Sequence, residues 1–279
     1  MTSKRSEALE QLLQVVDALR EPGGCPWDRK QTVRSMAKFV LEEAYELVEA
    51  IELEDDAHTC EELGDLLMVL ALISRIAQEA GRFDIEAATR AVHEKMIRRH
   101  PHVFGDKEAG DAEEALASWN SVKDEERAGQ AADTSVLAGL PIGMPALSRA
   151  AGTCDKAVGA SFRWKTAAGA WAKVEEELGE LREALATTDL DAGPKTRMQG
   201  ETLQRVQDEL GDLLMATAFF GRYVGLDPEE ALRSALRRFE GRFRHMEEQL
   251  DGPINSFDLP ELMAAWSTAK SAGAGAAKK

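Results

Sequence analysis

Cysteine, aromatic residues and long apolar segments are all scarce in this chain of 279 residues. The three cysteines, at positions 25, 60 and 154, show no CxxC or other metal-ligand spacing, which favours a reducing compartment over a disulfide framework. No apolar stretch is long enough to cross a bilayer. The amino-terminal segment also lacks the apolar core of a signal peptide. We therefore expect a cytoplasmic protein that does not insert into membranes.

An excess of basic residues is also missing. The chain has 34 Lys and Arg residues against 50 Asp and Glu residues, and its formal net charge is −16. A protein that binds DNA or RNA usually needs a basic face to neutralise phosphates, so nucleic acid is not an expected partner. A small phosphate-bearing molecule remains possible, because a divalent cation can join phosphates to carboxylates.

The abundant residues are Ala, Leu, Glu and Arg, which favour helices. Apolar residues recur at helical spacing, the runs end at Gly or Pro, and strand-like alternation is nearly absent. We predict an all-α fold. Helices are expected at 6–20, 32–53, 59–80, 85–99, around Trp119, and at 146–158, 167–186, 201–224, 228–250 and 259–270.

The heptapeptide ELGDLLM occurs twice, at residues 62–68 and 209–215. The sequences that flank the two copies can also be aligned, so the chain is predicted to contain a tandem duplication of one helical module. A stretch rich in Gly, Ala and Pro separates the copies. We predict an amino-terminal module at 1–124, a linker at 125–145, a carboxy-terminal module at 146–270 and a flexible tail at 271–279.

Each module contains two pairs of acidic residues spaced three apart, which places both carboxylates of a pair on one face of a helix. If the two helices pack as antiparallel neighbours, the four carboxylates converge. A single pair of this kind usually marks only a solvated face. The repetition and the apolar surroundings favour a site. The acids are Glu43, Glu46, Glu62 and Asp65 in the first module and Glu177, Glu180, Glu209 and Asp212 in the second.

The helix that contains Asp65 is apolar almost all round, so we expect it to be buried and Asp65 with it. Converging buried carboxylates require a cation. Oxygen ligands without His or Cys suit Mg²⁺, with Mn²⁺ as an alternative. A di-iron site is disfavoured because no Glu-x-x-His occurs. Gly64 and Gly211, inside the helices, predict a close approach by another helix or a ligand.

Basic residues downstream of the acids are candidate phosphate contacts. The tryptophans are candidates for stacking on a base, with a lysine four residues later for a phosphate; packing of each Trp in the core is the alternative interpretation. In the first module these candidates are Lys95, Arg98, Arg99, Trp119 and Lys123; in the second they include Arg238, Arg242, Trp266 and Lys270.

The acid motifs resemble a known family signature. EEAYE (42–46) with ELGD (62–65), and EELGE (176–180) with ELGD (209–212), are similar to the EExxE…ExxD signature of the MazG family. GGCPWDRKQT (23–32), GRFD (81–84) and RRHPHVF (98–104) also resemble that family. The resemblance covers roughly residues 6–270.

This resemblance implies a homodimeric all-α helical-bundle enzyme, of the all-α nucleoside triphosphate pyrophosphatase type, that hydrolyses NTPs or dNTPs to the monophosphate and pyrophosphate with Mg²⁺. It implies that the eight acids are metal ligands, and Glu177 or Glu180 is then the candidate to activate water. The substrate contacts that it implies are Lys173, Arg205, Arg238, Arg242, Trp266 and Lys270.

The chain departs from the family pattern in both modules. Gly152 stands where a Lys is expected. In the first module, Phe39 and His58 occupy the positions of Lys173 and Arg205. We therefore expect the carboxy-terminal module to be the stronger enzyme, in a role of nucleotide-pool house-cleaning. A non-catalytic helical protein that binds a nucleotide or a partner is the alternative, and the preferred base, sugar and metal count stay open.

Overall fold

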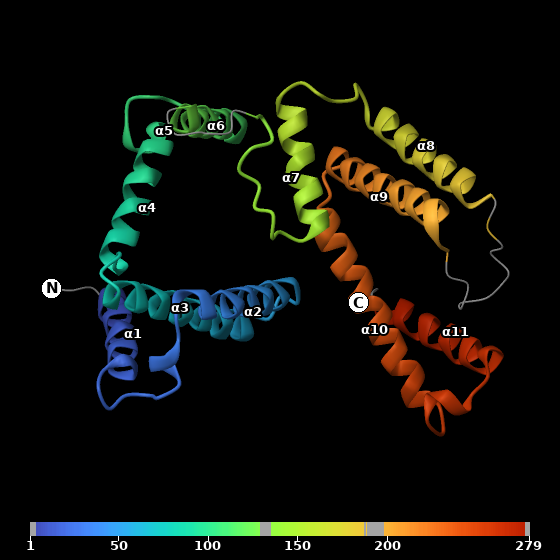
Figure 1. Cartoon of the computed structure of the whole chain (residues 1–279), viewed down its shortest axis with the longest axis horizontal. Helices are drawn as coiled ribbons and strands as arrows, with labels where there is room; N and C mark the ends of the chain where they lie inside the picture. The colour runs from blue at the N-terminus through green and yellow to red at the C-terminus, as the bar shows by residue number, and fades with distance from the viewer. Residues whose placement is uncertain (1–3, 129–134, 187, 189–197, 277–279) are drawn as a thin grey trace. The chain divides into compact units, whose positions relative to one another are not determined.

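The computed structural model describes residues 4–128, 135–186, 188 and 198–276. The chain divides into two compact units, unit 1 from Met1–Ala131 and unit 2 from Ala132–Lys279. The described residues form eleven α-helices and two short 3-10 segments, with no strand among them (Figure 1). The predicted all-α fold is confirmed.

Unit 1 is built around two long helices, α2 and α3, which contact each other along their length and run in opposite directions (Figure 1). Helix α1 packs on α3, and α4 carries the chain onward to α5 and α6. The bounds are α1 Lys4–Arg20, α2 Val33–Glu52, α3 Asp56–Glu79, α4 Ile85–Arg99, α5 Pro101–Phe104 and α6 Ala112–Ala128, with a 3-10 segment at Asp28–Lys30.

Unit 2 repeats this plan. Helices α8 and α9 form the long pair, α7 packs on α9 as α1 packs on α3, and α10 packs on α11. The bounds are α7 Ala146–Gly159, α8 Ala167–Leu185, α9 Gly200–Tyr223, α10 Pro228–Gln249 and α11 Leu259–Ala276, with a 3-10 segment at Ile254–Ser256.

Side-chain caps explain where several helices begin. Thr32 and Ser35 form a capping box at the start of α2. The carboxylate of Asp55 accepts hydrogen bonds from the amides of Ala57 and His58, so α3 begins three residues before the predicted position of 59. At the other end of the chain, α11 continues to Ala276, so residues 271–276 of the expected flexible tail are helical.

Small, well-packed cores hold the long helices together. In unit 1, Val16 of α1 and Met36 of α2 pack with Val69, Leu72 and Ile76 of α3. In unit 2, the fully buried residues are mostly small; they include Cys154 of α7, Ala170 of α8 and Ala218 of α9. Small residues let helix axes approach closely, and this packing positions the acidic ends of α2, α3, α8 and α9.

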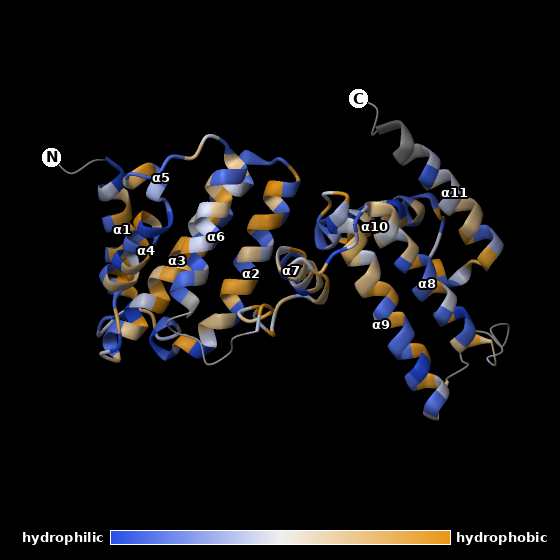
Figure 2. Cartoon of the chain, turned by 90° about the horizontal axis from the view of Figure 1, so that it is seen from above, coloured by the Kyte–Doolittle hydropathy of each residue, from blue (hydrophilic) through white to orange (hydrophobic). Residues whose placement is uncertain are grey.

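The prediction that the helix containing Asp65 is buried all round is wrong for the folded chain, and the corresponding helix of unit 2 is open in the same way. Leu63, Leu67 and Leu70 of α3 keep 48%, 43% and 44% of their surface exposed, and Leu210 and Leu214 of α9 keep 46% and 52%. Figure 2 shows apolar residues on the visible sides of α2 and α9. A two-helix pair covers only one face of each helix, so the opposite apolar face stays open. No helix in the described part of the chain has the length and hydropathy to cross a membrane.

Candidate active site

The acids of unit 1 come together on α2 and α3. Glu43, Glu62 and Asp65 can place one carboxylate oxygen each within 4.8 Å of one another. Glu62 is buried, with 6% of its surface exposed, Glu43 is half-buried, and Asp65 is exposed. The expected burial of Asp65 is therefore wrong, for the same reason that the leucines beside it are open. Glu46 is exposed and lies outside this group.

Glu62 is the electrostatic centre of the unit 1 group. One of its oxygens lies 2.9 Å from Nε2 of His58, one helical turn earlier. Its other oxygen is buried and has no hydrogen-bond partner among the described residues. Burial raises the pKa of Glu43, and the negative charges of Glu46, Asp65 and Glu62 raise it further. These carboxylates repel one another, and a cation would relieve the repulsion.

Unit 2 forms the corresponding group on α8 and α9. Glu177, Glu180 and Glu209 can bring one oxygen each within 4.8 Å of one another. Glu177 is the buried member, with 6% exposure, while Glu209 is half-buried and Glu180 is exposed. Asp212 is exposed and lies outside the group. Each unit thus brings together three of its four expected acids, and the omitted acid differs between the units.

Lys173 neutralises part of the unit 2 group. Its ammonium nitrogen lies 2.7 Å from carboxylate oxygens of both Glu176 and Glu177. These bonds raise the pKa of Lys173 and keep the lysine charged. The second oxygen of Glu177 is buried without a hydrogen-bond partner among the described residues. Burial and the charges of Glu177 and Glu209 raise the pKa of Glu180. Even with Lys173 in place, the group has an excess of negative charge.

The glycines in the two ELGD motifs face open space. A Cβ atom added at Gly64 or Gly211 would meet no atom within 4 Å. The prediction that another helix approaches Gly64 and Gly211 closely is therefore not met within the described chain. The other half of that prediction, the approach of a ligand, fits a surface that remains open beside the acids.

The remaining substrate-contact candidates of unit 2 lie on three helices. Arg205 is exposed on α9, one turn before Glu209. Arg238 donates a hydrogen bond of 2.6 Å to Ser234 within α10. Arg242 is half-buried on α10, and Trp266 of α11 packs against Phe239 with ring centroids 5.1 Å apart. Lys270 is exposed on α11. Lys173 is the one candidate with an ion pair to the acid group among the described residues.

In unit 1 the corresponding candidates are occupied by contacts within the protein. Arg99 pairs with Glu126 at 2.7 Å, and Arg98 pairs with the same carboxylate at 3.2 Å. The Arg99 guanidinium also lies 5.3 Å from the ring centre of Trp119, which packs against His100. Lys95 and Lys123 are half-buried. The contacts of Trp119 therefore support the alternative interpretation, in which this Trp has a packing role.

Sequence reasoning missed Glu126 and the pairing of His58. Glu126 lies on α6, 27 residues after Arg99, and no periodicity connects two such positions. His58 stands one turn before Glu62, so the spacing of four residues was the available signal. Both residues are specific to unit 1: the second module has Arg205 at the position of His58, and Gly273 seven residues after Trp266, as Glu126 follows Trp119.

Comparison with known proteins gives the family. The model of the MazG nucleotide pyrophosphohydrolase domain matches residues 31–104 and 166–247, which together contain both acid groups. The chain belongs to the MazG family. The two matched segments also show that the MazG module occurs twice, in tandem, and the family is one of hydrolases that act on nucleotides.

Relatives align with nearly the whole chain. The nucleoside triphosphate pyrophosphohydrolase/pyrophosphatase MazG of Thermotoga maritima is 38% identical over 264 residues, which cover 94% of this chain and 95% of the relative. The nucleoside triphosphate pyrophosphohydrolase of Escherichia coli K12 is 36% identical over 266 residues, covering 94% and 97%. A solved structure, a MazG-related protein from Thermotoga maritima, is 32% identical, covers 41% of this chain and 98% of that one, and superposes with a TM-score of 0.37.

Proposed function

We propose that this MazG-family chain hydrolyses nucleoside triphosphates to the monophosphate and pyrophosphate with Mg²⁺, and that the acid group of unit 2 is the active site. The observation that carries the proposal is the buried, unpaired oxygen of Glu177 inside a group of three carboxylates. The names of the relatives with nearly full coverage support the same reaction.

The residues of the group fit a hard divalent cation. The three donors Glu177, Glu180 and Glu209 supply oxygen atoms, and neither His nor Cys is among them. Mg²⁺ prefers oxygen ligands and keeps positions for water and phosphate, whereas the soft and intermediate metals prefer thiolate or imidazole. Asp212, one turn after Glu209 and exposed, is the fourth acid that the family resemblance implies as a ligand. Mn²⁺ fits the same donors.

The side chains around the acid group would position the substrate and balance its charge. When bound, Mg²⁺ would polarise the α-phosphoryl group and lower the pKa of water. Glu180, whose pKa is raised by burial and by the charges of Glu177 and Glu209, is suited to accept the proton of an attacking water. Lys173 stands beside Glu177 and can move to a phosphate oxygen. Arg238 and Arg242 of α10 are the candidates to stabilise charge on the leaving pyrophosphate.

Unit 1 is proposed to be the weaker site. It keeps a group of three acids, but His58 takes the pairing role and Phe39 replaces the lysine. Arg99 is held by Glu126 and Trp119. The alternative function, nucleotide binding without turnover, is favoured for this unit by that ion pair, because a guanidinium that already has a carboxylate contributes less to a phosphate.

We also propose a homodimer. The exposed apolar faces of α2, α3 and α9 include Leu41, Leu63, Leu67, Leu210 and Leu214. Leu63 and Leu67 are one turn apart on α3, and Leu210 and Leu214 are one turn apart on α9, so each unit by itself exposes apolar side chains along a helix face. Exposed apolar surface of this kind is typical of an interface. A second copy of the chain is the partner that the family resemblance implies. The biological role that we propose is house-cleaning of the nucleotide pool in the cytoplasm.

The direct test is pyrophosphate release by the purified full-length chain, with and without Mg²⁺, over a panel of NTPs, dNTPs and damaged nucleotides. Matched variants then identify the active unit. Glu209 and Glu62 occupy the same position of the repeated motif. We expect Glu209→Gln to abolish release and Glu62→Gln to leave most of it. Absence of release with every nucleotide would refute the proposed reaction, and loss in Glu62→Gln alone would move it to unit 1.

A further inference from the structure

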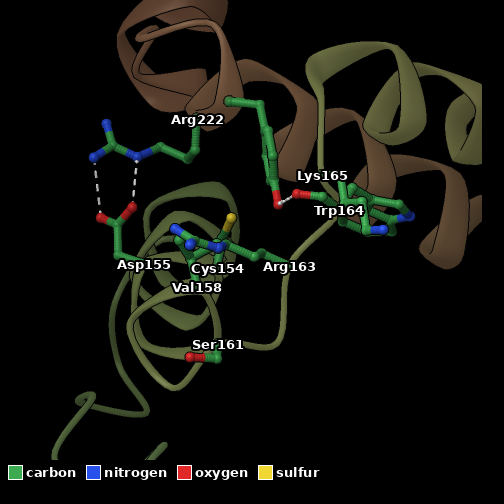
Figure 3. A pocket seen from close by; sticks show the side chains of 9 residues that line it. Cys154, Asp155, Val158, Ser161, Arg163, Trp164, Lys165 and Arg222 are labelled. Carbon is green, nitrogen blue, oxygen red and sulfur yellow. Dashed lines mark hydrogen bonds and ion pairs between the residues drawn. The ribbon is translucent and has the colours of Figure 1, made fainter.

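Unit 2 contains a cavity that the proposed reaction does not use. It has a volume of about 790 Å³ and lies between the end of α7, the loop from residue 161 to 165 and the end of α9. Figure 3 shows the residues that line it. They are Cys154, Asp155, Val158, Ser161, Arg163, Trp164, Lys165, Arg222 and Tyr223.

This cavity is separate from the acid group of unit 2. Both touch α9, but Glu209 lies in its first half, whereas Arg222 and Tyr223 lie at its carboxy-terminal end. The thirteen residues from Glu209 to Arg222 span about 20 Å of helix. A ligand in the cavity therefore does not contact the carboxylates of the candidate active site.

A comparison of equivalent positions in the two units explains why unit 2 has this cavity. Arg75 and Arg222 each stand ten residues after the Asp of their ELGD motif. Each pairs with an Asp on the first helix of its own unit, α1 or α7. Arg75 lies 3.3 Å from Asp17 in unit 1, and Arg222 lies 3.0 Å from Asp155 in unit 2. The residues just before these two aspartates, Val16 and Cys154, are both 1% exposed. The two ion pairs occupy the same place in the two modules.

In unit 1 an arginine fills the space beside this ion pair. Arg20, three residues after Asp17, has only 7% of its side chain exposed. Its guanidinium pairs with Glu79 and donates hydrogen bonds to the carbonyl oxygens of Asp28 and Gln31. In unit 2, Val158 stands three residues after Asp155 and is too short to cross this space. Helix α9 ends at Tyr223, so it has no residue at the place of Glu79.

The unit 2 loop adds positive charge to the vacant space. Arg163 and Lys165 line the cavity, and neither has an ion pair or hydrogen bond from its side chain to another described residue. The single carboxylate of the lining, Asp155, already accepts hydrogen bonds from Nε and Nη2 of Arg222, each at 3.0 Å (Figure 3). The lining thus has three cations against one anion. That balance is opposite to the net charge of −16 of the whole chain.

The loop that bears these cations is anchored. The hydroxyl of Tyr223 donates a hydrogen bond of 3.1 Å to the carbonyl oxygen of Trp164. The Trp164 ring packs edge-on against both Tyr223 and Phe219. Arg163 and Lys165 flank this fixed residue, so their backbone positions are set at the rim of the cavity before any ligand arrives.

We propose that this cavity, with Arg163 and Lys165 at its rim, binds a small phosphate-bearing molecule. Arg and Lys are the usual phosphate-binding side chains, and a dianionic phosphate can use two cations where a carboxylate uses one. The Ser161 hydroxyl adds a donor. The volume lies within the range of about 300 to 1,000 Å³ that small-molecule sites occupy, and the aromatic wall suits a ligand of nucleotide size.

The test measures binding of pyrophosphate and of AMP to the full-length chain by calorimetry in excess EDTA. Without divalent metal, the acidic groups repel phosphates, so binding reports on the cavity and does not depend on the proposed reaction. We expect the double variant Arg163→Ala/Lys165→Ala to bind at least about tenfold more weakly, since charge-assisted hydrogen bonds are lost. The charge-preserving variant Arg163→Lys/Lys165→Arg should restore most of the affinity.

The matched control is Arg29→Ala/Lys30→Ala, which removes the same two charges from the counterpart loop of unit 1, where Arg20 fills the space. It should bind as the wild type does. Absence of binding by the wild type in EDTA, or equal loss in both double variants, would overturn the proposal. Binding of pyrophosphate but not AMP restricts the site to free phosphates, and the reverse result assigns it to nucleotides; either one supports the site. Helical circular dichroism of each variant excludes misfolding as the cause.

Discussion

The ammonium nitrogen of Lys173 lies 2.7 Å from Glu177, the buried acid of the unit 2 group. In unit 1 the buried acid is Glu62, on the other helix of the pair, and its partner is His58 at 2.9 Å. Two copies of one helical pair therefore bury different acids and place different side chains beside them. This asymmetry predicts that the two units respond differently to equivalent substitutions.

Replacing Lys173 with Met should lower the rate of pyrophosphate release by roughly a hundredfold. This is the usual loss when an enzyme lacks one hydrogen-bond donor that stabilises negative charge in the transition state. The physical reason is that Lys173 is the cation nearest to the acid group. Lys38→Met, which changes an exposed lysine on the corresponding helix of unit 1, is the control and should keep full activity. Activity of Lys173→Met equal to that of the wild type would mean that the lysine only neutralises Glu177.

Mg²⁺ should raise the melting temperature of the wild type, because it binds the folded acid groups and not the unfolded chain. At a concentration of about 100 times the dissociation constant, one site contributes about 2.7 kcal/mol. The double variant Glu177→Gln/Glu209→Gln should lose the part of the melting-temperature increase that comes from unit 2. Glu175→Gln, which changes an exposed acid outside the group, should keep the full increase. A thermal scan with and without Mg²⁺ measures this without any turnover. An unchanged shift in the double variant would exclude these acids as ligands.

The arginines of α4 and α10 should differ in importance. Arg99 is already paired with Glu126, whereas Arg242 has no ion pair to another described residue. We expect Arg242→Ala to lower pyrophosphate release by roughly a hundredfold and Arg99→Ala to leave it within about twofold. The Arg99 variant should instead weaken the contact between α6 and α4, which hydrogen exchange of α6 amides would detect. Equal loss of release in both variants would show that unit 1 shares the catalysis.

The helices and the acid groups could be predicted from local pattern. Apolar residues at helical spacing and caps such as Thr32 and Asp84 depend on neighbours in sequence, so the structure places α2 and α4 where they were expected. The approach of Glu43 to Glu62 followed from one further assumption, that consecutive helices pack as antiparallel neighbours. That assumption holds in both units.

Burial and long-range pairing could not be predicted in the same way. The apolar residues around Asp65 predict burial, but periodicity shows only that a face is apolar and does not identify which part of the molecule covers it. The contact of Glu126 with Arg99, and the space that Arg20 fills in unit 1, depend on how distant helices meet. The cavity at Arg163 likewise depends on how α7, the loop before α8 and the end of α9 meet.

The ion pair between Arg20 and Glu79 should make the stability of unit 1 depend on pH. The Arg20 guanidinium, with a hydrogen bond of 3.1 Å from its Nε, lowers the pKa of Glu79 below its ordinary value of 4.5. A group whose pKa is lower in the folded state stabilises the fold fully above its unfolded pKa and loses this contribution as the pH falls through the folded pKa. The contribution is therefore present at pH 7 and declines as the pH falls below 4.5 toward the lower pKa of the folded state.

Glu79→Gln should accordingly lower the free energy of unfolding by about 1 kcal/mol at pH 7, a value at the upper end for a partly exposed pair. The difference between the variant and the wild type should shrink as the pH falls from 7 to 3, because a protonated Glu79 is neutral like glutamine. Urea unfolding at both pH values measures the difference. Glu86→Gln is the control, since Glu86 and its partner Arg90 are 72% and 65% exposed and should contribute almost nothing. A gap between wild type and Glu79→Gln that is the same at pH 7 and pH 3 would show that the charge of Glu79 does not stabilise the fold.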